Sequence, residues 1–417
     1  MIHQSSDKLK KFWLVLSVGI NLGFLAFFKY YNFFIESFAE LLQNFGFNAN
    51  ITTLNLIMPV GISFYTFHGL SYVFDIYNKK VEPTKNFVQY SLFVSYFPLL
   101  VAGPIERATH LLPQVKVLRT FKYRVAIDGL RQFLWGLIKK VVIADNCAEY
   151  ANLIFNNSDH YSGLTLLLGA VLFAFQIYGD FSGYTDMALG VSRLFGIELL
   201  KNFNYPYFSR NISEFWRRWH ISLSSWFRDY LYIPLGGSRV STLLKIRNTF
   251  IIFIVSGFWH GANWTFIFWG ALNALFIVPT ILAKEKKPMT SVVAEGRLLP
   301  SLKEFFQVVF TFLITVFAWI FFRAESLSHA FRYISDMFSF EYRGVFGDPE
   351  IKNSLLCIVL IIPFLILEWL GREQNYALET LGSKWPRYVR WSFYSLLIFL
   401  VGIFMSVGGE MFIYFQF

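Results

Sequence analysis

The feature that most constrains this chain is a long run without acidic or basic residues that contains one histidine. No Asp, Glu, Lys or Arg occurs between Arg247 and Lys284, and His260 lies inside this run. As a single helix the run would be roughly 50 Å long, whereas the hydrocarbon core of a bilayer is about 30 Å thick. We therefore expect the run to bend or to cross a membrane twice, and Gly257 and Gly261 are the natural place for the break.

The composition extends this expectation to the whole chain. Of the 417 residues, 55% are hydrophobic and 15% are charged, whereas soluble domains carry about 25% charged residues. Most of the windows that lack Asp, Glu, Lys and Arg approach the ~20 residues that span a bilayer. These windows are 12–28, 41–74, 86–105, 160–179, 248–283, 305–322, 353–367 and 391–409. We predict an all-α fold, a multi-pass transmembrane helical bundle with about nine crossings and additional interfacial or re-entrant helices.

In a membrane protein, the net charge of +10 is better explained by membrane topology and contact with lipid headgroups than by nucleic-acid binding. Three connecting segments are rich in Lys and Arg, and we place them in the cytoplasm: 106–124, 201–247 and 371–390. Cys147 and Cys357 lack the spacing of a metal site, and we expect no metal. The sequence also has no Walker-type phosphate loop, which argues against an ATP-driven pump.

His260 is the first candidate for chemistry. An ionisable side chain at membrane depth is costly, so it marks a functional site by default. A neutral imidazole near pH 7 can act as a general base and take the proton of a hydroxyl whose oxygen attacks a carbonyl. Gly257 and Gly261 would allow close approach by a substrate. The alternative is a buried histidine whose hydrogen bonds are satisfied by a neighbouring helix. For His68, another intramembrane histidine, the aromatic surroundings favour packing.

Further candidates lie at the ends of the apolar windows and in the polar connections. His220 could orient His260, bind a substrate carbonyl or donate a proton to a leaving thiolate, or it could be an interfacial histidine. Asp180 could pair with an arginine or orient a histidine, or it could be a solvated acid at a helix end. Arg217 and Arg218 could bind the phosphates of coenzyme A. The alternative for these arginines is a role in membrane topology and lipid contact.

Several motifs resemble a known family. Residues 217–224 (RRWHISLS), 232–237 (YIPLGG) and 256–262 (SGFWHGA) resemble the membrane-bound O-acyltransferases, and more narrowly their bacterial alginate O-acetyltransferase branch. The likeness begins at 58–65 (MPVGISFY) and continues through 101–105 (VAGPI), 180–184 (DFSGY) and 321–324 (FFRA) to 412–417 (FIYFQF). Several motifs in order over almost the whole chain are more specific than any one of them.

The resemblance implies a single membrane-embedded O-acyltransferase domain over residues 1–417 that encloses a catalytic tunnel. His260 matches the family's active-site histidine, His220 matches its second recurrent histidine, and Asp180 fits the pattern. Family members usually begin with additional hydrophobic helices, whereas this chain opens at what looks like a later point. The predicted catalytic residues are therefore His260, His220 and Asp180, and the predicted substrate-binding residues are Arg217, Arg218, Trp259 and Asn263.

The function that the resemblance implies is transfer of an acetyl group from cytoplasmic acetyl-CoA, or another acyl thioester, to a hydroxyl of an extracytoplasmic polysaccharide such as alginate. The enzyme would lie in the bacterial cytoplasmic (inner) membrane and act directly or through a periplasmic or surface partner protein. Within the same class, D-alanyl transfer from a carrier protein to teichoic acid is an alternative. From a different class, a transporter could use His260, His220 and Asp180 as a proton relay.

Overall fold

The computed structural model describes residues 2, 6–47, 52–283, 291–339, 349–405 and 412. Within these ranges the chain forms helices and no β-strand, which confirms the prediction of an all-α fold. Seven segments there are long and apolar enough to cross a membrane, in agreement with a multi-pass protein. Residues 413–417 of the C-terminal motif lie outside the described residues.

The helices follow one another with short 3-10 and π-helical turns between some of them. Their bounds are α1 Asp7–Leu25, α2 Tyr31–Asn44, α3 Ile62–Tyr77, α4 Phe87–Val94, α5 Ala108–Lys116, α6 Tyr123–Leu137, α7 Asp145–Asn156, α8 Gly163–Leu194, α9 Ile212–Arg218, α10 Ile221–Phe227, α11 Thr242–His260, α12 Trp264–Leu282, α13 Leu302–Arg323, α14 Leu327–Met337, α15 Pro349–Asn353, α16 Leu355–Gly371 and α17 Arg387–Phe404. The candidate spans are Asp7–Asn44, α8, α11, α12, α13, Ile351–Gly371 and α17.

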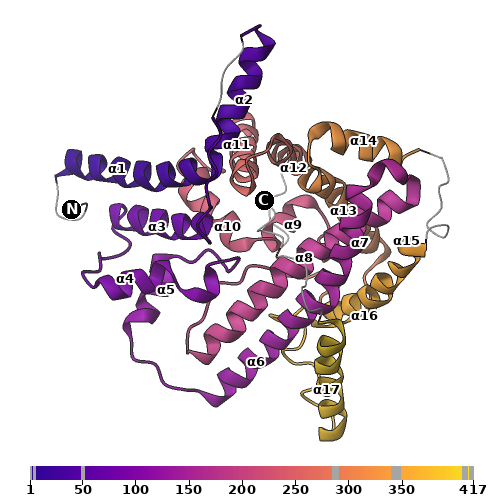
Figure 1. The fold of residues 1–417 in the computed structure, drawn as a ribbon. Helices are drawn as coiled ribbons and strands as arrows, with labels where there is room; N and C mark the ends of the chain where they lie inside the picture. The colour runs from indigo at the N-terminus through magenta and orange to yellow at the C-terminus, as the bar shows by residue number, and fades with distance from the viewer. Residues whose placement is uncertain are drawn as a thin grey trace.

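The helix α8 is the centre of the bundle, and α6, α7, α13 and α14 all contact it (Figure 1). Glycines allow α6 and α8 to touch through their backbones. A Cβ atom on Gly136 would meet the carbonyl oxygen of Gly183, and one on Gly190 would meet the carbonyl oxygen of Gly129. Small residues are the usual means of such close helix crossings in membranes. The backbones of α6 and α8 therefore pack in direct contact at these glycines.

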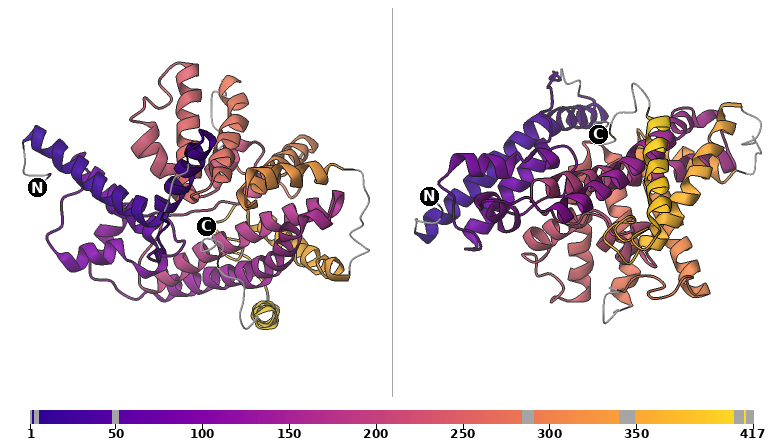
Figure 2. Two further views of the ribbon diagram at one scale, coloured as in Figure 1. Left: turned by 45° about the horizontal axis from the view of Figure 1, so that its top comes forward. Right: turned by 90° about the horizontal axis from the view of Figure 1, so that it is seen from below.

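The charge-free run around His260 breaks into two helices that pack side by side, α11 and α12, seen together in both views of Figure 2. The expected break is therefore confirmed. A Cβ atom on Gly257 would meet the carbonyl oxygen of Phe266, and one on Gly261 would overlap the Phe266 ring. The space beside both glycines is filled by α12. They serve the approach of that helix, and our expectation that they open the backbone to a substrate was wrong.

A polar cluster joins α3, α5 and the segment that follows α8. His68 Nε2 accepts the backbone N–H of Glu106 at 3.2 Å, and His68 Nδ1 lies 3.3 Å from the carbonyl oxygen of Val94. Both ring nitrogens are therefore used, which confirms a packing role for His68. The buried Glu106 carboxylate also accepts the backbone N–H of Leu200 at 2.6 Å and contacts His110 Nδ1 at 2.7 Å.

This last contact predicts a pH-dependent contribution to stability. The hydrogen bond to Glu106 raises the pKa of His110 above its ordinary value of 6.5. Because the folded-state pKa is the higher one, the stabilisation is fully present below about pH 6.5 and is lost as the pH rises through the raised pKa. His110→Gln should lower the thermal midpoint of the detergent-solubilised protein at about pH 6 and change it little at about pH 9. The exposed His160→Gln is the control, and an equal loss at both pH values would contradict the prediction.

Candidate active site

Two histidines from distant parts of the sequence meet inside the bundle. His260 is the last residue of α11, and His220 directly precedes α10. Both side chains are buried, and the centroids of their rings lie 6.5 Å apart. The structure thus brings together two of the three residues that the sequence predicts to be catalytic.

Aromatic side chains enclose His260. The ring centroids of Trp259, Trp269 and Phe322 lie 4.8, 5.3 and 5.3 Å from that of His260. Trp259 is buried, and its indole N–H has no hydrogen-bond partner among the described residues. These rings give the His260 imidazole a mostly apolar surrounding.

The backbone at His220 has an unusual conformation. Its φ and ψ angles are 45° and 53°, in the left-handed region that non-glycine residues rarely adopt. Two backbone hydrogen bonds of 2.9 Å hold this turn, one from Ile221 N to Asn202 O and one from Asn204 N to Arg218 O. The surrounding structure therefore fixes a strained residue between α9 and α10, and such residues are concentrated at functional sites.

Asn202 determines which nitrogen of the His220 ring carries the hydrogen. Its Oδ1 accepts the backbone N–H of Ser222 at 3.2 Å, which fixes the orientation of the amide because a backbone N–H can only donate. His220 Nδ1 lies 3.0 Å from the same oxygen and must therefore be the protonated nitrogen. Burial lowers the pKa of His220 to about 3, so the ring is neutral and its Nε2 holds a lone pair. This buried Nε2 has no hydrogen-bond partner among the described residues.

Asp180 is buried on α8 and forms an ion pair with Lys140, at 2.8 Å. Lys140 also pairs with Asp145 and belongs to the π-helical turn Ile138–Ala144, not to the basic connection that could have supplied an arginine. The next residue, Phe181, directs its ring edge-on to His220 with 4.7 Å between the centroids. The 180–184 motif therefore contributes a wall of the site through Phe181, and the catalytic role of Asp180 stays a prediction.

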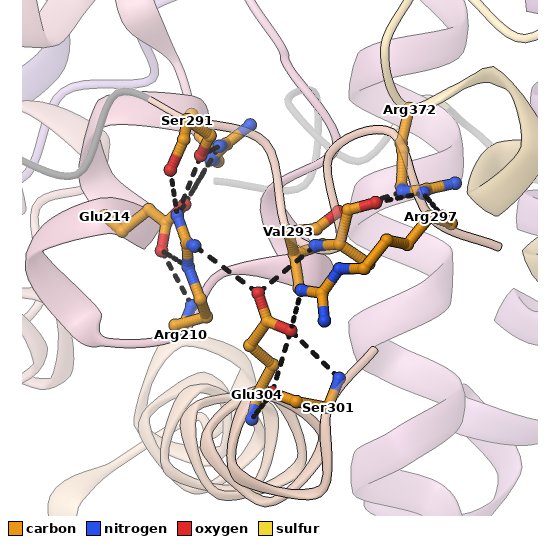
Figure 3. A network of polar contacts seen from close by, with 10 residues as sticks. Arg210, Glu214, Ser291, Val293, Arg297, Ser301, Glu304 and Arg372 are labelled. Atoms are coloured by element: carbon orange, nitrogen blue, oxygen red, sulfur yellow. Dashed lines mark hydrogen bonds and ion pairs between the residues drawn. The ribbon is translucent and has the colours of Figure 1, made fainter. Parts of the chain in front are cut away.

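The two adjacent arginines have different environments. Arg217 is exposed. Arg218 is buried and donates to Glu214 Oε1 at 2.9 Å and to the carbonyl oxygen of Ser291 at 3.1 Å. Figure 3 shows that Glu214 also binds Arg210. Arg218 thus holds α9 in place, and a phosphate contact of Arg217 stays a prediction.

The network of Figure 3 continues from α9 to the neighbouring elements. Arg210 lies 3.8 Å from the Glu304 carboxylate, and Glu304 forms a capping box with Ser301 at the start of α13. At the end of α16, Arg372 donates to the carbonyl oxygen of Val293 at 2.9 Å. These contacts anchor the segment 291–301 and α9 together, and α9 leads directly into His220.

Asn263, another predicted substrate-binding residue, is the N-cap of α12. Its Oδ1 accepts the backbone N–H of Thr265 at 3.0 Å, and its Nδ2 donates to the carbonyl oxygen of Glu325 at 2.9 Å. Both ends of the amide are thus engaged in holding the start of α12. Its contact with a substrate stays a prediction.

Sequence reasoning missed three residues that fix the two histidines. Asn202 gave no signal, because one asparagine in a polar connection resembles any other. Lys29 Nζ donates to the carbonyl oxygens of Trp259 and His260 at 2.8 and 2.9 Å, and the neighbouring Tyr30 hydroxyl donates to the same turn of α11. Lys29 did give a signal, since it is the only charged residue between positions 12 and 35.

A polar cavity of about 170 Å³ lies on the other side of Asn202, between α6, α8 and the segment 199–205. Four buried polar atoms that belong to its lining have no hydrogen-bond partner among the described residues: Asn202 Nδ2, Ser182 Oγ, Thr185 Oγ1 and Tyr205 Oη. Lys201 also lines it, and burial lowers the pKa of its ammonium to about 8. This cavity offers hydrogen-bond donors and positive charge to a polar ligand.

The fold is thus that of a multi-pass helical membrane protein, and its buried histidine pair suits acid–base chemistry. A model of the membrane-bound O-acyltransferase family matches residues 60–322, which include both histidines. The chain belongs to the membrane-bound O-acyltransferase family and is an O-acyltransferase.

The chain is similar to curated relatives over most of its length. It is 41% identical to a probable alginate O-acetylase of Pseudomonas aeruginosa over 90% of this chain and 69% of the relative. It is 38% identical to a peptidoglycan O-acetyltransferase of Helicobacter pylori over 81% of this chain and 66% of that protein. A teichoic acid D-alanyltransferase of Bacillus subtilis is 29% identical over 54% of this chain and 59% of its own length. The resemblance to the alginate O-acetyltransferase branch is confirmed.

The geometry at Asn202 predicts how its replacement changes acyl transfer. Asn202→Asp keeps an oxygen facing His220 and adds a negative charge, which should raise the pKa of His220. The acid limb of the pH–rate profile should then move to higher pH. Asn202→Ala removes the oxygen that holds the His220 ring and should lower the rate about tenfold, the effect of losing one hydrogen bond worth ~1.5 kcal/mol. Asn157→Ala, on an exposed turn, is the control, and an unchanged profile in Asn202→Asp would contradict this role.

Proposed function

We propose that this protein transfers an acetyl group from a cytoplasmic thioester to a hydroxyl of an extracytoplasmic polysaccharide. Residues 1–417 would form one membrane-embedded domain in the bacterial inner membrane, with a tunnel that joins its two faces. Its crossings would number about nine, the seven candidate spans being joined by shorter apolar helices such as α3. The observation that carries the proposal is the buried pair of His220 and His260 in a chain of this family.

Acetyl transfer is favoured over D-alanyl transfer by the comparisons. The relatives named for O-acetylation of alginate and peptidoglycan share 41% and 38% identity with more than four fifths of this chain. The D-alanyltransferase of Bacillus subtilis shares 29% with about half of it. Family membership likewise favours a transferase over a transporter with a histidine proton relay. The acceptor would be alginate or another cell-surface glycan, reached directly or through a periplasmic or surface partner.

In the proposed mechanism His260 is the general base. It takes the proton of the acceptor hydroxyl while the oxygen attacks the thioester carbonyl, and the thiolate leaves and is protonated. His220 Nε2 carries a lone pair, so it would accept a hydrogen bond from a second O–H or N–H of the substrates and help to orient them. Trp259 would exclude water. Asp180 would act through Lys140 by holding the π-helical turn against α8.

Of the remaining predicted substrate-binding residues, one is exposed and two hold helices in place. Arg217 is exposed and would contact phosphates of the donor. Arg218 and Asn263 would support binding by fixing α9 and the start of α12.

For the donor we propose the polar cavity beside Asn202. Coenzyme A and carrier proteins present their thioesters on the same phosphopantetheine arm, which is rich in amide and phosphate oxygens. The unpartnered donors of the cavity and the Lys201 ammonium would bind such oxygens, with the thioester end directed toward the histidine pair. Part of the cavity lining comes from the segments 199–205 and 375–376, which fall largely in connections that we expect in the cytoplasm.

The main test is the transfer of labelled acetyl from acetyl-CoA by the purified protein in nanodiscs. The wild type should consume the thioester in the presence of an alginate or peptidoglycan acceptor. His260→Ala should fold normally and lose at least about 10² in rate. The exposed His160→Ala should behave as the wild type. Full activity of a folded His260→Ala protein would remove the base assignment.

The same assay distinguishes the alternatives by the donor that is supplied. Consumption of a D-alanyl carrier protein but not of acetyl-CoA would replace acetyl transfer with D-alanyl transfer. Flux of a solute or of protons through proteoliposomes without any thioester loss would replace transfer with transport.

The donor site makes a separate prediction. Lys201→Met removes the ammonium from the cavity and should raise the KM for the donor about 10- to 100-fold, because hydrogen bonds to charged groups contribute ~1.5–3 kcal/mol. The kcat should change much less, since Lys201 lies apart from the reacting atoms. Lys122→Met, an exposed lysine of another basic connection, should leave both constants unchanged. A fall in kcat at constant KM would contradict this role for Lys201.

A further inference from the structure

A second cavity lies directly beside His260. It has a volume of about 90 Å³ and is lined by Lys29, by the segment 58–64, and by Val101, Trp259 and His260. Among these lining residues Lys29 is the only lysine, arginine, aspartate or glutamate. It comes from the π-helical turn Ala26–Tyr30, more than two hundred positions away from His260 in the sequence.

Lys29 is held at this cavity by the end of α11. Its Nζ donates to the carbonyl oxygens of Trp259 and His260 at 2.8 and 2.9 Å, and Tyr30 donates to that of Phe258 at 3.0 Å. The last carbonyl groups of a helix have no donor within the helix, and a positive charge there is favoured by the helix dipole. These contacts hold the ammonium against the backbone of His260 itself.

Capping alone does not require a charge at this position. The neutral hydroxyl of Tyr30 already serves one carbonyl of the same turn. A positive charge in an apolar, half-buried segment is costly, so its presence calls for a function. An ammonium has three N–H donors, and the two carbonyls use two of them. One N–H donor of the ammonium is therefore left at a side chain that lines the cavity with His260.

We propose that Lys29 is a catalytic residue that binds the carbonyl oxygen of the acyl thioester in this cavity and stabilises the negative charge that forms there. The inference rests on the acyl-transfer function proposed above. As the hydroxyl oxygen bonds to the carbonyl carbon, His260 takes the proton and the π electron pair of the carbonyl moves onto its oxygen, beside the ammonium. When that pair returns, the carbon–sulfur bond breaks and the thiolate takes the proton from His260. Lys29 keeps its proton throughout.

The physical basis is electrostatic. A fixed donor aimed at a developing oxyanion stabilises the transition state more than the neutral substrate, and it does so most strongly where water is excluded. The small volume of the cavity and its apolar segment 58–64 fit an acetyl group better than a long acyl chain. Gly61 has a φ of +76°, and a Cβ atom there would overlap the carbonyl oxygen of Leu100, so the wall of the cavity is set by a close backbone contact.

The test compares two variants that remove neighbouring hydrogen bonds to the same turn of α11. Lys29→Met removes the charge, whereas Tyr30→Phe removes one capping bond and leaves the charge. We expect Lys29→Met to lower kcat on the order of 10²- to 10³-fold, as loss of one oxyanion donor does, with little change in the KM for the donor. Tyr30→Phe removes one neutral hydrogen bond that helps to hold the same turn, so it should lower kcat by less than about tenfold. Comparable kcat losses in the two variants would show that Lys29 only holds the helix end, and would overturn the proposal.

A chemical rescue covers the case in which Lys29→Met fails to fold. Lys29→Cys can be alkylated with 2-bromoethylamine, which restores an ammonium at nearly the length of lysine, while Cys147 and Cys357 are buried. The proposal expects kcat to rise at least tenfold after aminoethylation and not after methylthiolation, which adds no charge. Equal activity after both treatments would overturn it.

The controls also separate this proposal from the proposed function. If the wild type transfers no acyl group from any thioester, the function itself fails. If the wild type is active and His260→Ala is not, but Lys29→Met keeps its kcat, only the role of Lys29 fails.

Discussion

The site depends on how a helix is ended inside an apolar bundle. The carbonyl groups in the last turn of α11 have no N–H donor within the helix, and the core of a membrane contains no water that could donate to them instead. Lys29 and Tyr30, from the first candidate span, supply those donors. The end of α11 is thereby held at one place, and His260 is its last residue. The first span and the eleventh helix are joined at the point where the chemistry is expected.

The backbone of the second histidine, His220, is also held in place, but by other contacts than those at His260. His220 stands in a left-handed turn that is closed by backbone hydrogen bonds to 202–204. The network around Glu214 fixes the helix that leads into it. The backbone at each histidine is thus held by contacts from distant parts of the chain, and the His220 ring is also oriented by Asn202.

The sequence was sufficient for the class of fold and for the histidine pair, because both have strong chemical signatures. The charge-free windows predicted the helical membrane protein, and the length of the run around His260 predicted its break into α11 and α12. Ordered motifs predicted the family. Asn202 could not be found in this way, since its importance arises from a contact across eighteen positions and not from a local pattern. The glycines of α11 were assigned to a substrate because sequence alone does not reveal that Phe266 of the next helix occupies the space.

The left-handed backbone of His220 has a consequence for anyone who alters this residue. Among side chains with a Cβ atom, asparagine, aspartate and histidine are the ones most often found in that region, whereas alanine is disfavoured there. Replacement by alanine therefore removes the imidazole and also releases the turn between α9 and α10. Replacement by asparagine keeps the backbone preference and removes only the ring. At this one position the customary truncation is the less specific probe, and a polar isostere gives the cleaner measure of what the imidazole contributes.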